Sequence, residues 1–504
     1  MKVRAMACSP KRVESHLLIA IQIRYQALAA IRTCASWPHQ GHILCKILPM
    51  VKLGYPFTLG VASGEPLPDG IILWTRLAPD PLDPVRPGGM PGRTAAVRWE
   101  IAEDEKLARV VQSGEASARP ERAHSVHVRV AGLRPGREYY YRFSVDGHES
   151  PVGRTRTAPD PGSTAPVRFA VASGQRYEEG RFTALRHLAA ERPDVIVHLG
   201  GYMYAHAIGR SGPDAYVRPL ESEAECTTLA AYRNRYATYR MDPDLRAAHA
   251  AAPWLPVLDD HEVREGYAGA LPGDGSSPAA FLKRRAAAFK AYYEHMPLRV
   301  RPAGASLRVH RWRPYGRVAD LVLLDTRQHR DGDDMLGAEQ EEWLRARLAG
   351  GAARWRVLVQ PAFFGPRVIA DGSASGWDAF PRSRARVLAD APEGLVVLSG
   401  DAGDGWAGDL RADPADPGSR TVGVEFSAAS VSAAPRPGSQ AVLDRNPHLR
   451  LATDRRGYLT CTADMDGLRA EFRAVDHVDR PDAPVFMVAR YEIADGRLRR
   501  IGAE

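Results

Sequence analysis

The chain has 504 residues, of which 44% are hydrophobic and 25% charged, and its formal net charge is +8. This length allows two or three domains, and the composition is typical of a globular protein. We interpret the positive charge as a solvated basic surface on arginine-rich helices, without interleaved aromatic and basic residues. Sequence-specific nucleic-acid binding is therefore not expected, and attraction of anionic substrates is the alternative. No run of about 18 apolar residues is present, so no transmembrane helix is expected.

Residues 1–53 hold most of the lysines, whereas the remainder is rich in Ala, Arg, Gly and Pro. We interpret this segment as a leader or extension outside the fold, although it is a poor match to a signal peptide. A wrongly assigned start site would explain that mismatch. The cysteines form no Cys-x-x-Cys pair, so neither a zinc site nor a disulfide framework is indicated. They are Cys8, Cys34, Cys45, Cys226 and Cys461.

Residues 54–157 have the pattern of a small β-domain. Short strands are expected at 57–60, 70–76, 96–101 and 127–130, separated by Gly, Pro and Asp turns. The stretch 132–145, GLRPGREYYYRFSV, places a Leu-x-Pro-Gly turn before a tyrosine-rich strand, as in the tyrosine corner of fibronectin-like and immunoglobulin-like sandwiches. Tyr139 or Tyr141 is expected to close the corner with its hydroxyl. Residues 158–166 are interpreted as a linker.

From residue 167 to residue 504 the pattern changes to alternating strands and helices, which is typical of a layered α/β enzyme with its site at the strand ends. The stretch 193–206, PDVIVHLGGYMYAH, is central, because a β-branched strand ends there in a double glycine. Further strands are expected at 167–172, 254–258, 318–324, 355–360, 395–398, 421–426, 457–463, 468–475 and 485–493. Helices are expected at 180–191, 220–240, 243–252, 278–295 and 338–348.

Carboxylates and imidazoles follow several of these strands. Asp259, Asp260, His261 and Glu262 come after one strand and Asp401 after another, and His448 lies in a later Asn-Pro-His segment. Clustered oxygen and nitrogen donors suit divalent and trivalent metals, and two such ions clamp both oxygens of a phosphoryl displacement. A solvated acidic turn is the alternative for the first group by itself. Together the groups favour a metallohydrolase.

These segments and several longer ones resemble the PhoD-like alkaline phosphatase family. The resemblance implies a four-layer α/β/β/α metallophosphatase domain preceded by a β-sandwich. It also implies an extracytoplasmic hydrolase of phosphate mono- and diesters with an iron–calcium centre. The matching stretches are YPFTLGVASGEPLPDGIILWTRLAP at 55–79, RYEEGRFTALRHLAAERPDVIVHLG at 176–200, LDDHEV at 258–263, LLDTRQHR at 323–330, EQEEWL at 339–344, NPHLRL at 446–451 and RRGYLTC at 455–461.

The resemblance also implies roles for individual residues. His261, Asp260 and Arg327 would be catalytic, and the metal ligands would be Asp259, Asp260, Asp401, His448 and Tyr202. Four ligand positions are changed, because this chain has Gly174, Gly201, Gly266 and Gly403 where the family pattern implies Cys, Asp, Asn and His. Loss of thiolate and carboxylate charge weakens a site for a trivalent ion. The candidate replacement ligands are Glu265, Asp404 and His206.

Three functions follow from this pattern. The first is a family member with impaired or lost catalysis that still holds an anionic phosphoester. The second is an active phosphoesterase with a reduced or rewired metal site, and the third is a non-catalytic structural protein. Arg327 and Arg456 are candidate phosphate-binding cations, with ion pairing to nearby carboxylates as the alternative. The metal, the substrate and the oligomeric state are not indicated.

Overall fold

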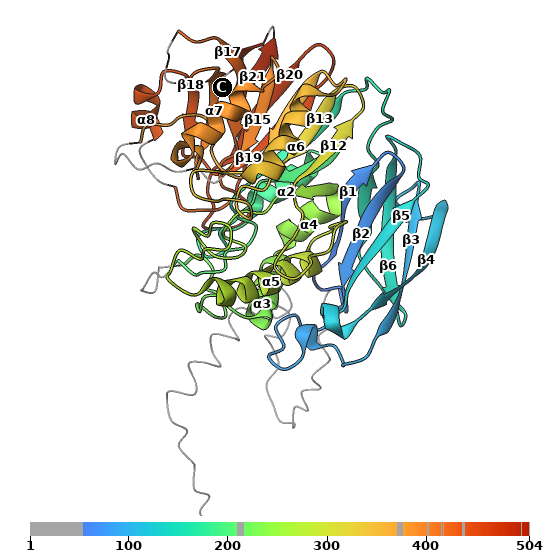
Figure 1. The fold of residues 1–504 in the computed structure, drawn as a ribbon. Coiled ribbons are helices and arrows are strands. Elements are labelled where there is room, and N and C mark those ends of the chain that lie inside the picture. Colours follow the sequence, from blue (N-terminus) through green and yellow to red (C-terminus); the bar gives the residue numbers. More distant parts are fainter. Residues whose placement is uncertain are drawn as a thin grey trace, which may run out of the picture. The chain divides into compact units, whose positions relative to one another are not determined.

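The computed structural model describes residues 54–208, 216–369, 376–400, 403–414, 416, 418–435, 439–494 and 496–502. The leader expected at 1–53 and Asp401 therefore lie outside the described residues. In the described part, three sheets and the α-helices that flank them form layers (Figure 1). No helix among these residues is long and apolar enough to cross a membrane.

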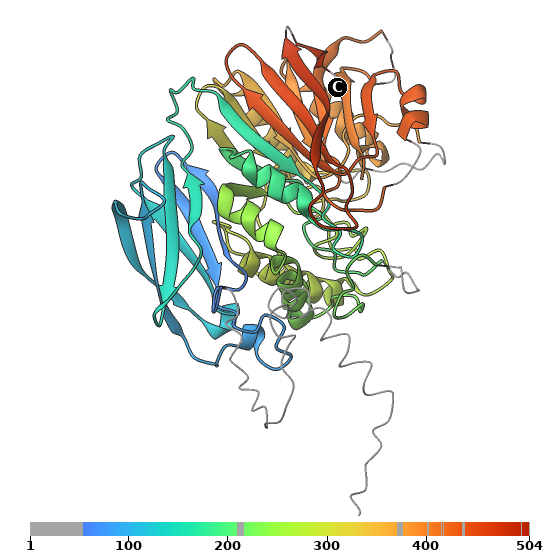
Figure 2. The same ribbon diagram turned by 180° about the vertical axis from the view of Figure 1, so that it is seen from behind.

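The largest sheet has ten strands in the spatial order β22-β21-β20-β19-β9-β10-β11-β1-β2-β5. Figure 2 shows its C-terminal strands, drawn in red, beside the green strand β9. The strands are β1 (Val61–Leu67), β2 (Gly70–Arg76), β5 (Ser125–Ala131), β9 (Val167–Ala172), β10 (Val195–His198), β11 (Pro253–Pro256), β19 (Gly457–Ala463), β20 (Leu468–Val475), β21 (Val485–Ala494) and β22 (Arg497–Gly502).

The second central sheet has seven strands in the order β12-β13-β14-β15-β17-β16-β18. Strands β13, β14, β15 and β17 run parallel, and all their residues except Thr421 and Arg356 are buried, as expected for strands covered on both faces. The strands are β12 (Arg311–Tyr315), β13 (Ala319–Leu323), β14 (Trp355–Val359), β15 (Leu395–Ser399), β16 (Gly405–Arg411), β17 (Thr421–Ser427) and β18 (Leu449–Thr453).

The two central sheets pack face to face through one apolar core that includes Val197, Leu323, Val396 and Leu398. Helices cover the outer face of each sheet, so the predicted α/β/β/α order is confirmed. On the ten-stranded sheet these are α2 (Thr183–Ala190), α3 (Leu229–Arg240), α4 (Pro243–Ala251) and α5 (Pro278–His295). On the seven-stranded sheet they are α6 (Gly337–Ala349) and α7 (Pro381–Ala389), and α8 (Ser439–Arg445) lies beside β18.

The N-terminal part is a β-sandwich that shares a sheet with the rest. A five-stranded sheet packs through a separate apolar core on β1, β2 and β5, which are themselves the edge of the ten-stranded sheet. β1 pairs in parallel with β11, with Ser63 opposite Pro253. The strands of the smaller sheet are β3 (Ala95–Ala102), β4 (Val110–Ala118), β6 (Glu138–Val145), β7 (His148–Glu149) and β8 (Gly153–Arg156), and short 3-10 turns lie at η1 (Pro87–Gly89), η2 (Pro120–Arg122) and η3 (Gly376–Ala379).

The predicted tyrosine corner is present, and Tyr139 closes it. Its hydroxyl accepts a hydrogen bond from the backbone N–H of Arg134 over 3.0 Å. The Tyr139 side chain is 2% exposed, so the hydroxyl satisfies a backbone donor that water reaches poorly. Tyr141 instead lies with its ring near Phe143 in the sandwich core.

Two predicted elements differ from the structure. Residues 57–60 form turns, and the strand begins only at Val61. The helix expected at 220–240 starts at Leu229, because Thr228 caps it by accepting a hydrogen bond from the N–H of Ala231. Before that cap the backbone is irregular, and the N–H of Cys226 donates to the carbonyl of Ala205.

Candidate functional site

The polar loops that follow the parallel strands lie at one edge of the sheets. In the ten-stranded sheet, Ala172 of β9 pairs with His198 of β10, and His198 pairs with Pro256 of β11. The three strands therefore end at the same level. Their following loops bring together Gly174, Gly201 and the acidic segment that begins at Asp259.

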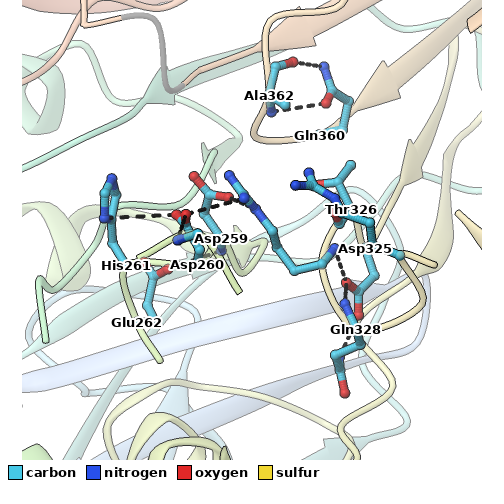
Figure 3. A network of polar contacts seen from close by, with 12 residues as sticks. Asp259, Asp260, His261, Glu262, Asp325, Thr326, Gln328, Gln360 and Ala362 are labelled. Carbon is cyan, nitrogen blue, oxygen red and sulfur yellow. Dashed lines mark hydrogen bonds and ion pairs between the residues drawn. The ribbon is translucent and has the colours of Figure 1, made fainter. Parts of the chain in front are cut away.

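The acidic segment forms a compact donor cluster. Ligand atoms of Asp259, Asp260 and His261 lie within 4.8 Å of one another, and no other group of three such side chains is found in the described part of the chain. Asp259 is 1% exposed and Asp260 is 5% exposed. Figure 3 shows the two carboxylates side by side, with His261 turned toward Asp260. Two buried carboxylates this close need a positive charge nearby.

Arg327 supplies that charge. Its Nε donates to Oδ1 of Asp259 over 2.7 Å, and its terminal nitrogen lies 3.2 Å from Oδ2 of Asp260. Burial by itself raises the pKa of Asp260, but the charges of Arg327 and His261 and the N–H of Gly266 outweigh it and lower the pKa to about 2. Asp260 therefore stays ionised at neutral pH, and both aspartates lie within ion-pair distance of the guanidinium. The guanidinium of Arg327 thus forms the ion pairs that were the alternative to phosphate binding.

The loop that carries Arg327 is fixed by Asp325. Its Oδ1 accepts hydrogen bonds from the N–H groups of Arg327 and Gln328, each over 2.9 Å. The side chain of Gln340 on α6 holds the backbone of Asp325 at both its N–H and its carbonyl. Figure 3 shows the hydrogen bonding between Asp325 and Gln328. Arg327 is therefore positioned by α6 through Asp325.

Glu262 stabilises the turn from below the cluster. It accepts hydrogen bonds from the N–H of Tyr202 over 2.5 Å and from the N–H of Asp259 over 3.0 Å. Burial raises the pKa of Glu262 to about 7, although these hydrogen bonds oppose the rise. The side chain thus links the loop after β10 to the loop after β11.

Gly174 and Gly201 lie against each other. A Cβ atom built on Gly201 would be 3.0 Å from the Cα of Gly174 and 3.0 Å from the hydroxyl of Tyr204. Both glycines have positive φ, +56° at Gly174 and +63° at Gly201, and their backbones are joined through the N–H of Gln175, which donates to the carbonyl of Gly201. Side chains at either position meet both backbone strain and crowding.

Tyr204, rather than the predicted Tyr202, faces the cluster. The Tyr202 hydroxyl forms a 2.9 Å hydrogen bond with Nε2 of His249, inside the core between the sheet and its helices, so the predicted metal ligand points away from the site. The Tyr204 ring stacks on His261 at 4.3 Å, and its hydroxyl lies beside the two glycines. Tyr204 follows Tyr202 by two positions in the same loop. From the sequence only Tyr202 is predicted as a ligand, although only Tyr204 faces the site.

Comparison with known proteins identifies the family. The family model described as "PhoD-like phosphatase" matches residues 169–472, and "PhoD-like phosphatase, N-terminal domain" matches residues 50–159. Alkaline phosphatase D of Bacillus subtilis (strain 168) is 42% identical over 472 residues, which cover 86% of this chain and 79% of that protein. The chain belongs to the PhoD-like phosphatase family.

Solved structures agree with this assignment. The structure titled "Structure of PhoD" has a TM-score of 0.85 and 40% identity, over 90% of this chain and 93% of that one. A purple acid phosphatase, PPD1 from yellow lupin, has a TM-score of 0.54 over 88% of this chain and 75% of that one. Its identity is only 13%, so this likeness concerns the fold alone.

The remaining predicted site residues of this PhoD-like protein lie outside the cluster or at its margin. His448 is not in it, because its Nε2 donates to the carbonyl of Pro366 over 2.8 Å beside β18. Asp404 pairs with Arg456 over 2.8 Å, which gives both residues a partner other than a metal or a phosphate. His206 and the exposed Glu265 pair with each other over 3.0 Å near His261.

The glycines at the other two changed positions are open. A Cβ on Gly266 or Gly403 would have no atom of the described residues within 4 Å, so no described side chain fills either position. The N–H of Gly266 donates to Asp260 over 2.7 Å. These positions therefore contribute backbone groups only.

The donors that the described residues provide do not by themselves fit a centre of two metal ions. Among the described residues, the cluster offers two carboxylates and one imidazole, and Arg327 occupies both carboxylates. A cation entering here must displace a guanidinium that is buried with them. The places that would hold two further ligands, Gly174 and Gly201, have no side chain and are in contact. A dinuclear site would lack the shared negative charge that holds two cations together.

Proposed function

We propose that this PhoD-like protein binds a phosphate ester at the strand ends without hydrolysing it by the two-metal route. Gly174 and Gly201 carry the proposal. They lie against each other where the strand ends meet, and neither has a side chain that could bind a metal ion there. Arg327 supports it by pairing with both Asp259 and Asp260. A guanidinium cannot activate water as a metal ion does, since it lowers no water pKa by coordination.

The chain's own residues offer an anion several contacts at this place. The Tyr204 hydroxyl and the His261 imidazole lie together, and the guanidinium of Arg176 sits 4.0 Å above the Tyr204 ring. A hydroxyl and an imidazole N–H donate to phosphate oxygens, and the nearby cation supports that charge. We assign the ester's anionic group to these residues. The organic group is not specified by them.

Metal analysis combined with ester hydrolysis tests this proposal. The purified protein, loaded with iron and calcium and then dialysed, should retain less than one metal ion per chain. It should hydrolyse p-nitrophenyl phosphate and bis-p-nitrophenyl phosphate at the rate of buffer alone. Phenyl phosphate should bind, and Tyr204→Phe should weaken it several-fold. Two tightly held metal ions with turnover that Asp259→Asn abolishes would overturn the proposal.

An active phosphoesterase with one metal ion is the second candidate. The cluster of Asp259, Asp260 and His261 within 4.8 Å favours it, since three such donors hold a single divalent ion. Asp401 would be a fourth donor in this case. One metal ion per chain, lost together with turnover in His261→Gln, would support this candidate against the first.

We propose that the protein acts outside the cytoplasm, as its family resemblance implies, and that any metal it does bind is iron or calcium. Both buried cysteines of the described residues, Cys226 and Cys461, are free thiols, so no disulfide bears on the compartment. Fractionation of the native host tests the location. Recovery of the protein only in the cytoplasm would contradict it.

A further inference from the structure

A groove lined by arginine and tryptophan lies between β12 and α6, apart from the strand-end loops. Its volume is about 280 Å³, and its walls include Arg308, His310, Trp312, Trp343 and Arg347. The underlying sequence, RVHRWRPY at 308–315, interleaves basic and aromatic residues. The expectation that the chain has no such stretch is therefore wrong here.

The aromatic wall has one ring face available. Trp312 is 36% exposed, an unusual exposure for so large an apolar side chain. The guanidinium of Arg347 lies 5.1 Å from the Trp312 ring centroid and covers one side of the indole. Trp343 is packed more deeply and touches the His310 ring at 5.1 Å. A planar ligand therefore has an indole to stack on and a second aromatic wall beside it.

The groove is rich in arginine, and carboxylates of the described residues balance only part of its positive charge. Arg311 pairs with the buried Glu65 over 2.7 Å, and Arg313 pairs with the same carboxylate. Arg308 and Arg347, by contrast, have no carboxylate within ion-pair distance among the described residues. The charge of Arg347 nevertheless opposes the rise that burial causes in the pKa of Asp320, which is hydrogen-bonded to the Trp312 side chain. Two guanidinium groups next to an open indole thus await negative charge, and guanidinium matches a phosphate group in shape.

Strand β12 is the edge of the seven-stranded sheet, but it is a poor edge for another protein strand. Pro314 removes one backbone donor from it, and three of its five residues are Arg or Trp. A volume of about 280 Å³ is just below the range of pockets that hold drug-sized molecules. A small ligand therefore suits the groove better than a second copy of the chain does.

We propose that this groove binds a nucleoside monophosphate. The base stacks on the open face of Trp312, and the phosphate lies between the guanidinium groups of Arg308 and Arg347. Stacking on an aromatic side chain and pairing of phosphate with arginine are the two interactions that nucleotide recognition uses without reading the base. The groove accordingly accepts purine and pyrimidine nucleotides alike.

The groove shares a loop with the strand-end site. The side chain of Gln328 clamps the backbone of Leu307, donating to its carbonyl over 2.7 Å and accepting from its N–H over 3.0 Å. The next residue, His329, has its ring 5.8 Å from that of His310 in the groove wall. The loop that places Arg327 in the strand-end site therefore also contacts the groove through Gln328 and His329. The two sites are distinct, and the groove does not depend on hydrolysis.

Calorimetric titration with adenosine monophosphate tests the groove directly. At low ionic strength we expect Trp312→Ala to weaken binding about tenfold, and Trp312→Phe, which keeps a ring, to restore most of it. Arg308→Ala should weaken binding by a similar factor and reduce its salt dependence. Arg382→Ala, which removes an exposed arginine of α7, is the matched control and should change nothing. Thermal unfolding of each variant checks that it is folded.

Three probes separate binding in this groove from binding at the strand ends or to a longer nucleic acid. Adenosine and inorganic phosphate should each bind the groove much more weakly than the monophosphate does, and Tyr204→Phe should leave the part of the monophosphate binding that depends on Trp312 unchanged. Binding that is lost in Tyr204→Phe but kept in Trp312→Ala would overturn the groove and leave the proposed ester site standing. A single-stranded DNA of ten nucleotides that binds tenfold more tightly than the monophosphate would also overturn the proposal, in favour of a site for single-stranded nucleic acid.

Discussion

Arg327 and Asp259 are joined by a buried 2.7 Å hydrogen bond between Nε and Oδ1, at the place where a PhoD-like phosphatase is expected to hold metal. The pair makes an internal cation part of the site. Since the same guanidinium also reaches Asp260, removing it takes away a cation that two buried carboxylates share.

Arg327→Met should therefore destabilise the protein by about 3–5 kcal/mol, the typical cost of breaking a buried pair from one side. The same variant should gain affinity for Mn²⁺, because a guanidinium no longer occupies Asp259 and Asp260. Urea unfolding with and without Mn²⁺ measures both effects. Arg382→Met, at an 82% exposed side chain, is the control and should change stability by less than about 0.5 kcal/mol. Equal responses of both variants to Mn²⁺ would contradict the blocking role of Arg327.

Adding a side chain at Gly201, where the strand ends meet, should lower the stability of the protein. Gly201→Ala is expected to cost about 2–3 kcal/mol, because its Cβ meets both the αL penalty and the 3.0 Å contact with Gly174. Gly147→Ala, at a similar positive φ of +77° but with open space, isolates the backbone penalty and should cost about 1 kcal/mol. Urea unfolding compares the two variants, and equal losses would show that the contact with Gly174 is not crowded.

Combining Gly174→Cys with Gly201→Asp tests whether ligands alone rebuild the metal site. We expect the double variant to stay at or below one metal ion per chain, because Arg327 still holds the carboxylates. Adding Arg327→Gln should then raise the metal content, as measured by elemental analysis after dialysis. If the double variant alone binds two metal ions, the role given to Arg327 is wrong.

His198 makes the fold sensitive to acid. Its side chain is fully buried between Tyr202 and Trp254, and burial lowers its pKa to about 3 from 6.5. Between these values the unfolded chain binds the proton more readily, so the stability that is present above pH 6.5 is lost as the pH falls toward 3. His198→Phe should remove about 2–3 kcal/mol of the loss between pH 7 and about pH 4.5, as measured by urea unfolding. Parallel pH profiles for both proteins would refute this.

The tyrosine corner should be worth about 1–2 kcal/mol, the cost of leaving a buried donor unsatisfied. Tyr139→Phe leaves the N–H of Arg134 without its acceptor in a poorly hydrated place. Tyr140→Phe is the control, because its hydroxyl bonds to the partly exposed Glu138 and the exposed Arg192. Urea unfolding of the two variants compares them. A larger loss from Tyr140→Phe would show that the corner is not the stabilising contact.

Much of the architecture was predictable because it follows local signals. The strand at 70–76, the strands at 457–463 and 468–475 and the helix at 278–295 have the predicted bounds, since apolar or alternating patterns mark the strands and a Ser-Pro start marks the helix. Strand β4 was missed, because its sequence VVQSGEASA is mostly exposed and contains weak strand formers.

The site was less predictable, because it depends on contacts between distant segments. Asp259, Asp260 and His261 are adjacent in sequence, so their clustering was found. His448 was placed there by its motif, but its position depends on a carbonyl of Pro366 that no local pattern indicates. The choice between Tyr202 and Tyr204 depends on which way the loop after β10 turns, and His249 decides it.

The pairing of β1 with β11 has a consequence for the order of events on the ribosome. Ser63 leaves the exit tunnel long before Pro253, its partner across the sheet, has been made. Until then the β1 edge of the N-terminal sandwich is unpaired, and pairings this distant in sequence form slowly. The edge strand β1 therefore lacks its native partner, and is open to non-native contacts or a chaperone, until more than half of the chain has emerged.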